Sequence, residues 1–137
     1  MTTSRRSFLA AASLSTVGVA TIAGAKEAPA AGANNKPLIH HVFFWLKNPS
    51  SKEDRAKLIE GLGTLRKIET IRKMHIGVPA ATEKRAVVDN SYSVSEILFF
   101  DDAAGQKAYQ DHPIHKKFVE TCEHLWERVV VYDAQDV

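Results

Sequence analysis

The stretch "LIHHVFFWLK", residues 38–47, places the strongest constraint on how this chain folds. Branched and aromatic residues of this kind predict a β-strand, in which side chains point alternately to opposite faces. One face carries Val42 and Phe44. The other carries Phe43 and Trp45. Because both faces are largely apolar, we expect both to be covered in the folded protein.

The first thirty residues differ in composition from the rest of the chain. Arg5 and Arg6 lie in "SRRSFLA", which resembles the twin-arginine export motif of bacteria. An uncharged run rich in Ala, Ser, Thr and Gly follows at 8–25, and small residues suited to a signal peptidase lie at 23–25 and 28–30. These features predict a periplasmic or secreted protein.

We therefore expect three segments along the chain. A signal peptide and the start of a linker occupy 1–30, the rest of the linker occupies 31–36, and one domain occupies 37–137. The uncharged run is short and diluted by small polar residues, so it is a poor transmembrane span. Cleavage would leave no stable membrane anchor, and an uncleaved anchor is the alternative.

The charge pattern of the expected mature protein argues against two classes of partner. From Lys36 onward, fifteen basic residues balance fifteen acidic ones. No basic stripe indicates nucleic-acid binding, and no basic amphipathic helix indicates a membrane-surface protein. Cys122 is the only cysteine of the chain, which precludes an intrachain disulfide.

Hydrophobic spacing and helix-capping signals predict the element order β-α-β-β-α-α-β. Ser50 and Glu53 form a capping-box pattern at the start of the first helix, and Pro113 separates the two later helices. Strands are expected at 38–47, 71–78, 91–100 and 128–134, and helices after Ser50, at 103–110 and after Pro113. Four strands with helices on one face indicate an α+β fold with a ferredoxin-like antiparallel sheet.

Such a layout leaves one sheet face without helices. That face would present an apolar patch too large to remain in water, formed by Ile39, Phe43, Trp45, Ile97 and Phe99. A second copy is the simplest cover, with two sheets packed face to face. We therefore expect a symmetric homodimer.

The run "AYQDHPIHKKF", residues 108–118, carries the residues best suited to chemistry. His115 is a candidate general base, because imidazole titrates near neutrality. Tyr109 is a candidate hydrogen-bond donor to a developing oxyanion, and the break before Pro113 would bring the two together. Alternatively, His112 and His115 bond backbone carbonyls and only shape a corner between two helices.

Four segments together resemble the stress-responsive A/B barrel domain family, the dimeric α+β barrels. They are "HHVFFWLK", "SYSVSEILFFDD", "AYQDHPIHKKF" and "LWERVVVYD", and the resemblance covers about residues 37–134. The family is functionally mixed and includes plant stress proteins and a plant polyketide cyclase. The resemblance thus implies a dimeric barrel with a pocket between sheet and helices, and leaves open whether this chain is an enzyme.

The resemblance also implies roles for individual residues. Tyr109 and His115 correspond to a Tyr and a His that serve aldol chemistry in the cyclase, and His40 to a histidine of its first strand. Phe118 and Trp126 correspond to residues of the pocket wall. His112 corresponds to the histidine that directly precedes the proline. A small hydrophobic or aromatic ligand would fit such a pocket.

Glu96 departs from the cyclase pattern, since an apolar wall residue is expected there. By alternation it shares a strand face with Val94 and Leu98. A buried carboxylate needs a partner, because desolvation of an unpaired charge is costly, and His40 or His115 is the natural partner. The pair would orient a catalytic histidine or serve only a structural purpose, and the further alternative is that Glu96 lies at a partly hydrated rim of the pocket.

Three functions stay open from the sequence. The first is an exported homodimeric small-molecule-binding protein, with acid–base lyase or cyclase chemistry in a His/Tyr pocket. The second is a non-enzymatic envelope stress-response protein. The third is a metal-dependent protein, for which His40, Glu96, His112 and His115 supply suitable ligand types but no compact motif. We assign no cofactor and no metal ligand.

Overall fold

The computed structural model describes residues 35–137. The expected signal peptide and most of the expected linker lie outside the described residues. Export and the segment boundaries therefore stay predictions. In the part that is described, no helix is long and apolar enough to cross a membrane.

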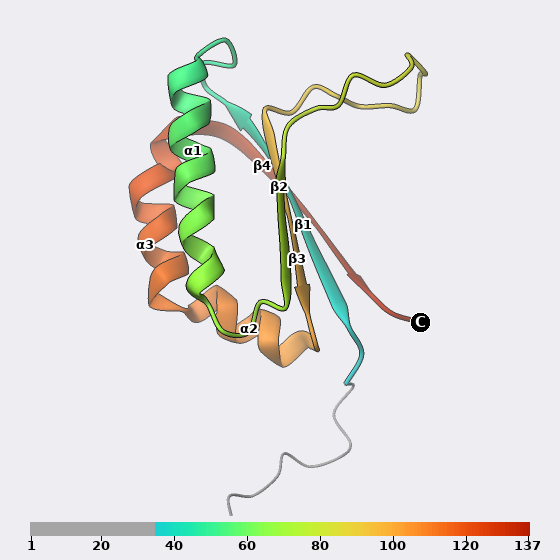
Figure 1. The fold of residues 1–137 in the computed structure, drawn as a ribbon, viewed down its shortest axis with the longest axis vertical. Helices are drawn as coiled ribbons and strands as arrows, with labels where there is room; N and C mark the ends of the chain where they lie inside the picture. The colour runs from blue at the N-terminus through green and yellow to red at the C-terminus, as the bar shows by residue number, and fades with distance from the viewer. Residues whose placement is uncertain (1–34) are drawn as a thin grey trace, which may run out of the picture. The chain divides into compact units, whose positions relative to one another are not determined.

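A four-stranded antiparallel sheet forms one layer of the domain (Figure 1). The strands are β1 Leu38–Leu46, β2 Lys73–Gly77, β3 Val94–Phe100 and β4 Trp126–Gln135. Their order across the sheet is β2-β3-β1-β4, so β3 and β1 are the inner strands. Each expected strand is present, and this ferredoxin-like α+β architecture confirms the predicted fold class.

The first helix, α1 Lys52–Thr64, continues into a 3₁₀ turn at Leu65–Lys67. Its N-cap is Ser51, whose hydroxyl accepts a 3.0 Å hydrogen bond from the backbone N–H of Asp54. The capping box predicted for Ser50 was thus wrong by one residue. Two adjacent serines offer the same side chain, so the capping pattern in the sequence does not distinguish them.

Two short helices, α2 Ala103–Asp111 and α3 Pro113–Cys122, lie on the same side of the sheet as α1 (Figure 1). Between them His112 has extended backbone geometry, with φ −65° and ψ 138°. Proline disfavours helical geometry in the residue before it and suits the first turn of a helix. The predicted helix break at His112 is therefore confirmed.

The hydrophobic core lies between the helices and the sheet. Helix α1 packs on β3 and β2, and the core comprises Val42, Phe44, Leu46, Leu58, Leu62, Leu65, Ile68, Val94, Leu98, Phe100, Tyr109, Phe118, Cys122 and Leu125. Gly61 lets α1 approach α3, because a Cβ at this position would lie 2.4 Å from Sγ of Cys122. A side chain there requires Cys122 and Phe118, or the helices themselves, to shift.

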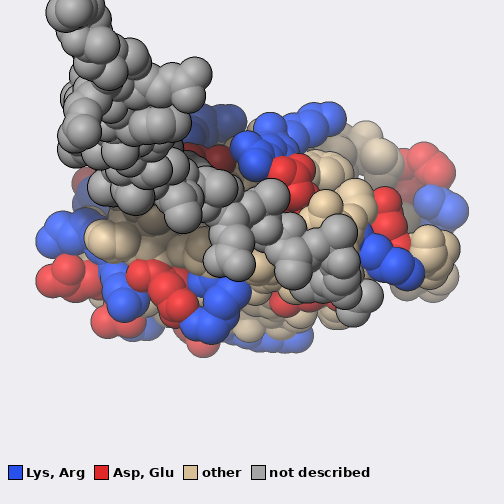
Figure 2. Space-filling view, turned by 90° about the horizontal axis from the view of Figure 1, so that it is seen from below, with Lys and Arg blue, Asp and Glu red and all other residues tan. Residues whose placement is uncertain are grey.

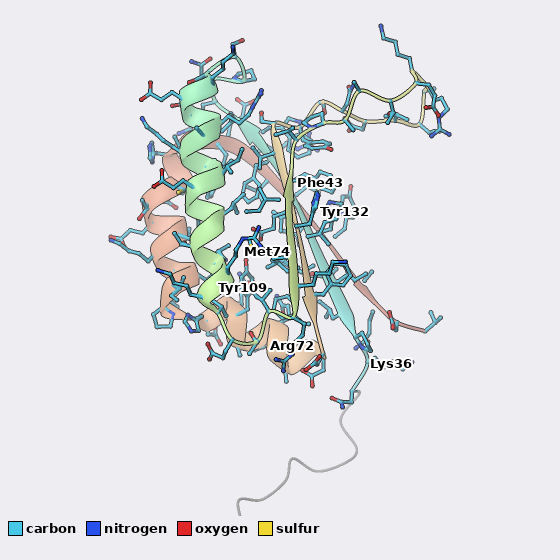
Figure 3. All side chains as sticks on the ribbon, viewed as in Figure 1. Lys36, Phe43, Arg72, Met74, Tyr109 and Tyr132 are labelled. Carbon is cyan, nitrogen blue, oxygen red and sulfur yellow. The ribbon has the colours of Figure 1, made fainter. Side chains whose placement is uncertain are left out.

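The other face of the sheet carries no helix in the described structure. Phe43 and Tyr132 point to this side, whereas Tyr109 lies on the helix side (Figure 3). The ring of Phe43 lies 4.9 Å from that of Tyr92 and 6.0 Å from that of Tyr132, centroid to centroid. The prediction of helices on one face only is thus confirmed, and the opposite face is rich in half-buried aromatic side chains.

Basic and acidic side chains are interspersed on the face seen in Figure 2. Exposed ion pairs of the described chain include Arg72 with Asp101 and Lys57 with Glu53. Exposed pairs of this kind contribute little to stability. The visible face has no extended patch of one sign that would identify a charged partner.

Candidate functional site

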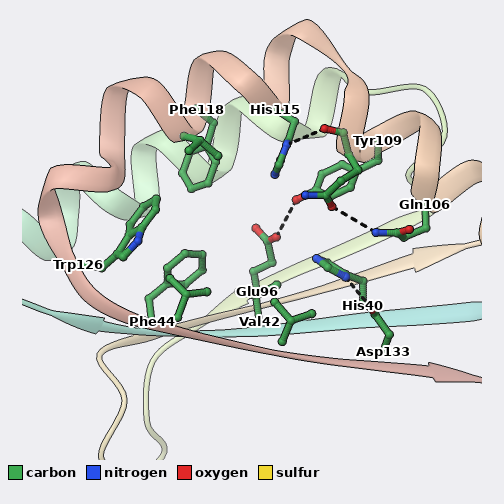
Figure 4. Close-up of a pocket in the computed structure, with 14 residues that line it drawn as sticks. His40, Val42, Phe44, Glu96, Gln106, Tyr109, His115, Phe118, Trp126 and Asp133 are labelled. Atoms are coloured by element: carbon green, nitrogen blue, oxygen red, sulfur yellow. Dashed lines mark hydrogen bonds and ion pairs between the residues drawn. The ribbon is translucent and has the colours of Figure 1, made fainter.

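A cavity of about 370 Å³ lies between the sheet and helices α2 and α3 (Figure 4). Cavities of this size accept small organic molecules. It is lined by His40, Val42, Phe44, Glu96, Gln106, Tyr109, Gln110, His115, Phe118, Val119, Trp126, Val129, Val131 and Asp133. Polar groups at its centre are thus combined with an apolar wall.

Strand register determines which polar side chains of the sheet reach the cavity. Val42 of β1 pairs with Glu96 of β3 on one side and with Val131 of β4 on the other. His40, two residues earlier on the same face, pairs with Asp133. Three ionisable groups from three adjacent strands therefore face the helices.

His40 and Asp133 form the shortest described contact in the site. Nδ1 of His40 lies 2.6 Å from Oδ1 of Asp133. A carboxylate accepts, so Nδ1–H donates to Asp133 and Nε2 stays free. The His40 side chain is buried and that of Asp133 is 49% exposed, which places this pair at the edge of the cavity.

Sequence reasoning missed Asp133. Alternation in "RVVVYDA" places residues 129, 131 and 133 on one strand face. That signal is present in the sequence, but it does not say which face meets the helices. Only the pairing of β4 with β1 decides this point, and it sets Asp133 beside His40.

Glu96 is almost fully buried, with 1% of its surface exposed. Its Oε1 accepts a 3.3 Å hydrogen bond from the hydroxyl of Tyr109, whereas its Oε2 has no hydrogen-bond partner among residues 35–137. Burial raises the pKa of Glu96 to about 8, against an opposing contribution from the Tyr109 hydrogen bond. Glu96 is therefore mainly a neutral carboxylic acid at pH 7.

The expected ion pair between Glu96 and a histidine is not formed, so this prediction was wrong. His40 is directed to Asp133, which lies opposite it on the neighbouring strand. In the part of the chain that the structure describes, Tyr109 instead supplies the one hydrogen bond that the carboxyl group of Glu96 receives. Protonation removes most of the cost of burying this carboxyl without a cation.

The phenol of Tyr109 is held in its protonated form by its surroundings. Burial raises its pKa first, and the nearby Glu96 and Asp133 raise it further. The ring of Tyr109 lies 5.6 Å from that of His40 and 4.6 Å from that of His115, centroid to centroid. The sequence thus predicted the proximity of Tyr109 and His115, which the break at Pro113 produces.

His115 combines the two roles that the sequence left as alternatives. Its Nδ1 lies 3.1 Å from the backbone carbonyl oxygen of Gln110, so it helps to shape the corner. A carbonyl can only accept, and Nδ1 therefore carries the proton while Nε2 has a free lone pair. Desolvation by burial lowers the pKa of His115 below its usual 6.5. At pH 7 the imidazole is therefore mainly neutral and can accept a proton. The ring lines the cavity (Figure 4).

His112 lies outside the residues that line the cavity. Its Nδ1 accepts a 3.1 Å hydrogen bond from the backbone N–H of Ile114 and so caps α3. Its Nε2 lies 3.5 Å from Oε2 of Glu69. The geometry gives His112 a structural role at the corner in place of the expected pocket position.

Aromatic rings form the apolar end of the cavity, where Phe118 and Trp126 both lie as expected. Their centroids are 5.8 Å apart, and Phe44 lies 5.1 Å from Trp126. Such rings would pack against a planar apolar group. Gln106 donates to Gln110 over 3.2 Å at the opposite, polar end.

The candidate metal ligands do not converge. Within residues 35–137, no group of three or more His, Cys, Asp or Glu side chains is arranged to hold a metal ion. His112 caps α3, and His40 is engaged by Asp133. What the cavity does offer is a neutral imidazole base beside two protonated oxygen acids.

Comparison with known proteins agrees with this fold. A dimeric ferredoxin-like protein of unknown function from Thermobifida fusca aligns with a TM-score of 0.61 at 17% identity, over 75% of this chain and 93% of that one. A Dabb family protein with a ferredoxin-like fold from Mesorhizobium loti aligns with a TM-score of 0.61 at 21% identity, over 74% and 98%. Hydroxynitrile lyase from Passiflora edulis aligns with a TM-score of 0.62 at 19% identity, over 75% and 95%.

These identities are low, so the structural alignments establish the fold alone. No curated protein sequence matches this chain. The sequence model of the stress responsive A/B barrel domain (Dabb) matches residues 38–136, which is most of the chain and the whole of the sheet-and-helix domain apart from its ends. The chain therefore belongs to the stress-responsive A/B barrel domain family.

Proposed function

We propose that this protein binds a small organic molecule in the cavity and acts on it as an acid–base lyase or cyclase. The observation that carries the proposal is the free Nε2 of His115 beside the protonated phenol of Tyr109, both lining one cavity with aromatic walls. His115 takes a proton from the substrate. Tyr109 donates a hydrogen bond to the oxygen on which negative charge develops.

The same two groups serve either reaction. In a lyase acting on a hydroxynitrile, Nε2 of His115 takes the hydroxyl proton and the oxygen electron pair forms the carbonyl. The carbon–cyanide bond then breaks, and cyanide leaves with the bonding pair and recovers the proton.

In a cyclase, the proton comes from the carbon next to a carbonyl. The resulting enolate attacks a second carbonyl of the same molecule, and the new alkoxide is protonated. The shared fold of the Passiflora edulis hydroxynitrile lyase supports the lyase alternative.

The functional unit in this proposal is a homodimer joined through the helix-free sheet face. Half-buried Phe43, Trp45 and Tyr92 line that face, and an isolated chain would leave them in contact with water. The Thermobifida fusca protein, which shares the fold, is described as dimeric. We also retain the proposal of export, which rests on the twin-arginine pattern at Arg5 and Arg6.

Two assays on the purified protein test the chemistry. One measures cyanide release from an aromatic hydroxynitrile, and the other measures exchange of the methyl protons of acetophenone with solvent deuterium by NMR. We expect the wild-type protein to accelerate at least one of them. Replacing His115 by Gln should reduce that rate roughly 10²–10⁴-fold, the usual contribution of a general base.

His124→Gln is the matched control, because His124 is exposed and lies outside the cavity lining. It should leave the rate unchanged. Rates equal to those of buffer in both assays, or equal rates for wild type and His115→Gln, would contradict the proposed chemistry.

A non-enzymatic stress-response protein remains the second candidate, favoured by the aromatic cluster on the outer sheet face. There the dimer itself would be the functional object. Phe43→Asp would then abolish function in the native cell whereas His115→Gln would not. The opposite pattern would exclude this candidate.

A further inference from the structure

We propose that Glu96, as an uncharged carboxylic acid, is the hydrogen-bond donor with which the cavity selects a neutral carbonyl compound carrying an apolar or aromatic substituent. This inference rests on the proposed small-molecule function and adds a substrate class to it. It assigns Glu96 a role in recognition, whereas the proton transfer itself belongs to His115.

The geometry of the carboxyl group is the first argument. Oε1 accepts the Tyr109 hydrogen bond, so the acid proton resides on Oε2. Oε2 is buried and has no acceptor within the described protein. A buried donor without a partner is destabilising, and a ligand that accepts a hydrogen bond would supply the missing partner. The terminal torsion of a glutamate side chain is broad, so Oε2 can turn to meet a ligand in the cavity that Glu96 lines.

The surroundings of Glu96 explain why the group stays neutral. The ionisable groups that face it are His40 from β1, Tyr109 from α2, His115 from α3 and Asp133 from β4. Asp133 engages His40, and burial favours the neutral form of His115. The other elements packed on β3 contribute apolar side chains: β2 places Ile76 beside Glu96 in the register, and the buried residues of α1 are Leu58 and Leu62. No permanent cation therefore stabilises a carboxylate here.

The cavity lining defines the class of ligand. Among the described residues, neither Lys nor Arg lines the cavity, so an anionic ligand such as a carboxylate or phosphate would be desolvated without a counter-charge. A carbonyl oxygen is neutral and accepts a hydrogen bond. Phe44, Phe118 and Trp126 supply the apolar contact for the rest of the molecule.

Three probes of similar size separate these contributions. Acetophenone carries a ring and a carbonyl, ethylbenzene carries the ring without an acceptor, and benzoate carries the ring with a negative charge. Their dissociation constants are measured for the full chain by NMR titration at pH 6.5. We expect acetophenone to bind roughly fivefold tighter than ethylbenzene, which corresponds to one net hydrogen bond, and benzoate to bind more weakly than acetophenone.

Variants then test whether Glu96 is the donor. Glu96→Leu should remove the preference for acetophenone and still bind ethylbenzene. Glu96→Gln keeps an N–H donor in the same place and should keep the preference at every pH, whereas the wild type should lose it as pH rises from 6.5 to 9.5. His115→Gln should keep the preference although it loses turnover.

The outcomes distinguish this inference from the proposed function. An unchanged preference in Glu96→Leu, or benzoate binding as tightly as acetophenone, would overturn the role of Glu96 and leave the chemistry of His115 intact. The expected binding pattern without turnover would support Glu96 and contradict the acid–base chemistry. If none of the three probes bound, the role of Glu96 and the proposed small-molecule function would both be contradicted.

Discussion

The hydroxyl of Tyr109 lies 3.3 Å from Oε1 of Glu96, and this hydrogen bond connects helix α2 to the inner strand β3. Both side chains are 1% exposed, and burial raises the pKa of each. The pair therefore stays protonated near neutrality and holds two acidic protons beside the free Nε2 of His115. Several consequences of this arrangement can be measured.

Glu96 should make the stability of the protein depend on pH. Its pKa is about 8 in the folded state, against a reference of 4.5. Between these values the unfolded chain releases a proton that the folded protein keeps. The free energy of unfolding should therefore fall as pH rises through this window, by up to about 1.4 kcal/mol per pH unit. Urea unfolding of wild type and Glu96→Gln, at one protein concentration, measures this decline.

Glu96→Gln should lack that decline because the amide does not titrate. Glu120→Gln is the matched control, since its carboxylate is exposed and pairs with Lys117 on the surface. A constant difference between wild type and Glu96→Gln from pH 5 to 8.5 would show that Glu96 does not retain its proton.

The rate of any reaction at this site should have a bell-shaped pH dependence. His115 must be neutral to act as a base, and burial lowers its pKa below 6.5. The rising limb of kcat/KM should therefore have its midpoint below pH 6.5. Ionisation of Glu96 near pH 8 should produce the falling limb. Rate profiles of wild type and Glu96→Gln test this assignment. The falling limb should be absent from the variant, and its persistence would assign it to another group.

Protonation of His41 on the outer sheet face should weaken the proposed dimer at low pH. His41 is half-buried there, and burial lowers its pKa first, with further lowering by His75 and His40. A protonated imidazole would have to be desolvated in the interface, so the dissociation constant should increase at least about tenfold between pH 7.5 and 5. Sedimentation velocity across this range measures the effect.

His41→Gln should reduce the pH dependence of the dimer, whereas His124→Gln, at an exposed position, should not. Equal pH dependence in both variants would exclude His41 as the responsible group.

Gly61 should be essential for the close approach of α1 and α3. A Cβ there would lie 2.4 Å from Sγ of Cys122 and 3.3 Å from the ring of Phe118. Gly61→Ala should therefore destabilise the protein by about 1–3 kcal/mol, as overpacking does. Gly63→Ala is the matched control, because nothing lies within 4 Å of its Cβ and alanine favours the helix by up to about 1 kcal/mol. Thermal unfolding of both variants measures these effects. A Gly61→Ala variant as stable as the wild type would contradict the close packing of α1 on α3.

Local patterns in the sequence predicted most of the fold. Alternation in the first strand corresponds to β1, and the repeat of Leu58, Leu62 and Leu65 corresponds to α1 and the turn after it. The break before Pro113 corresponds to the corner between α2 and α3. Each signal arises from residues close in the chain, which is why it can be read without a structure. Ser51 replaced Ser50 as the cap because two neighbouring serines are equivalent locally.

The candidate site was predictable only in part. Tyr109 and His115 meet because only five residues lie between them, and one of these is the proline that breaks the helix. Asp133 was missed, and Glu96 was given the wrong partner, because both depend on the register of strands far apart in the sequence. The size of the cavity likewise depends on how α2 and α3 sit over the sheet, which no local pattern encodes.

One measurement tests the central claim that a small organic molecule binds between the sheet and the helices beside His115. The protein, labelled with ¹⁵N in its histidine side chains, is titrated with acetophenone and followed by imidazole NMR. We predict that the ring signals of His115 and His40 shift with a single dissociation constant, while that of exposed His124 does not move. Unchanged His115 and His40 signals at millimolar acetophenone would contradict the account.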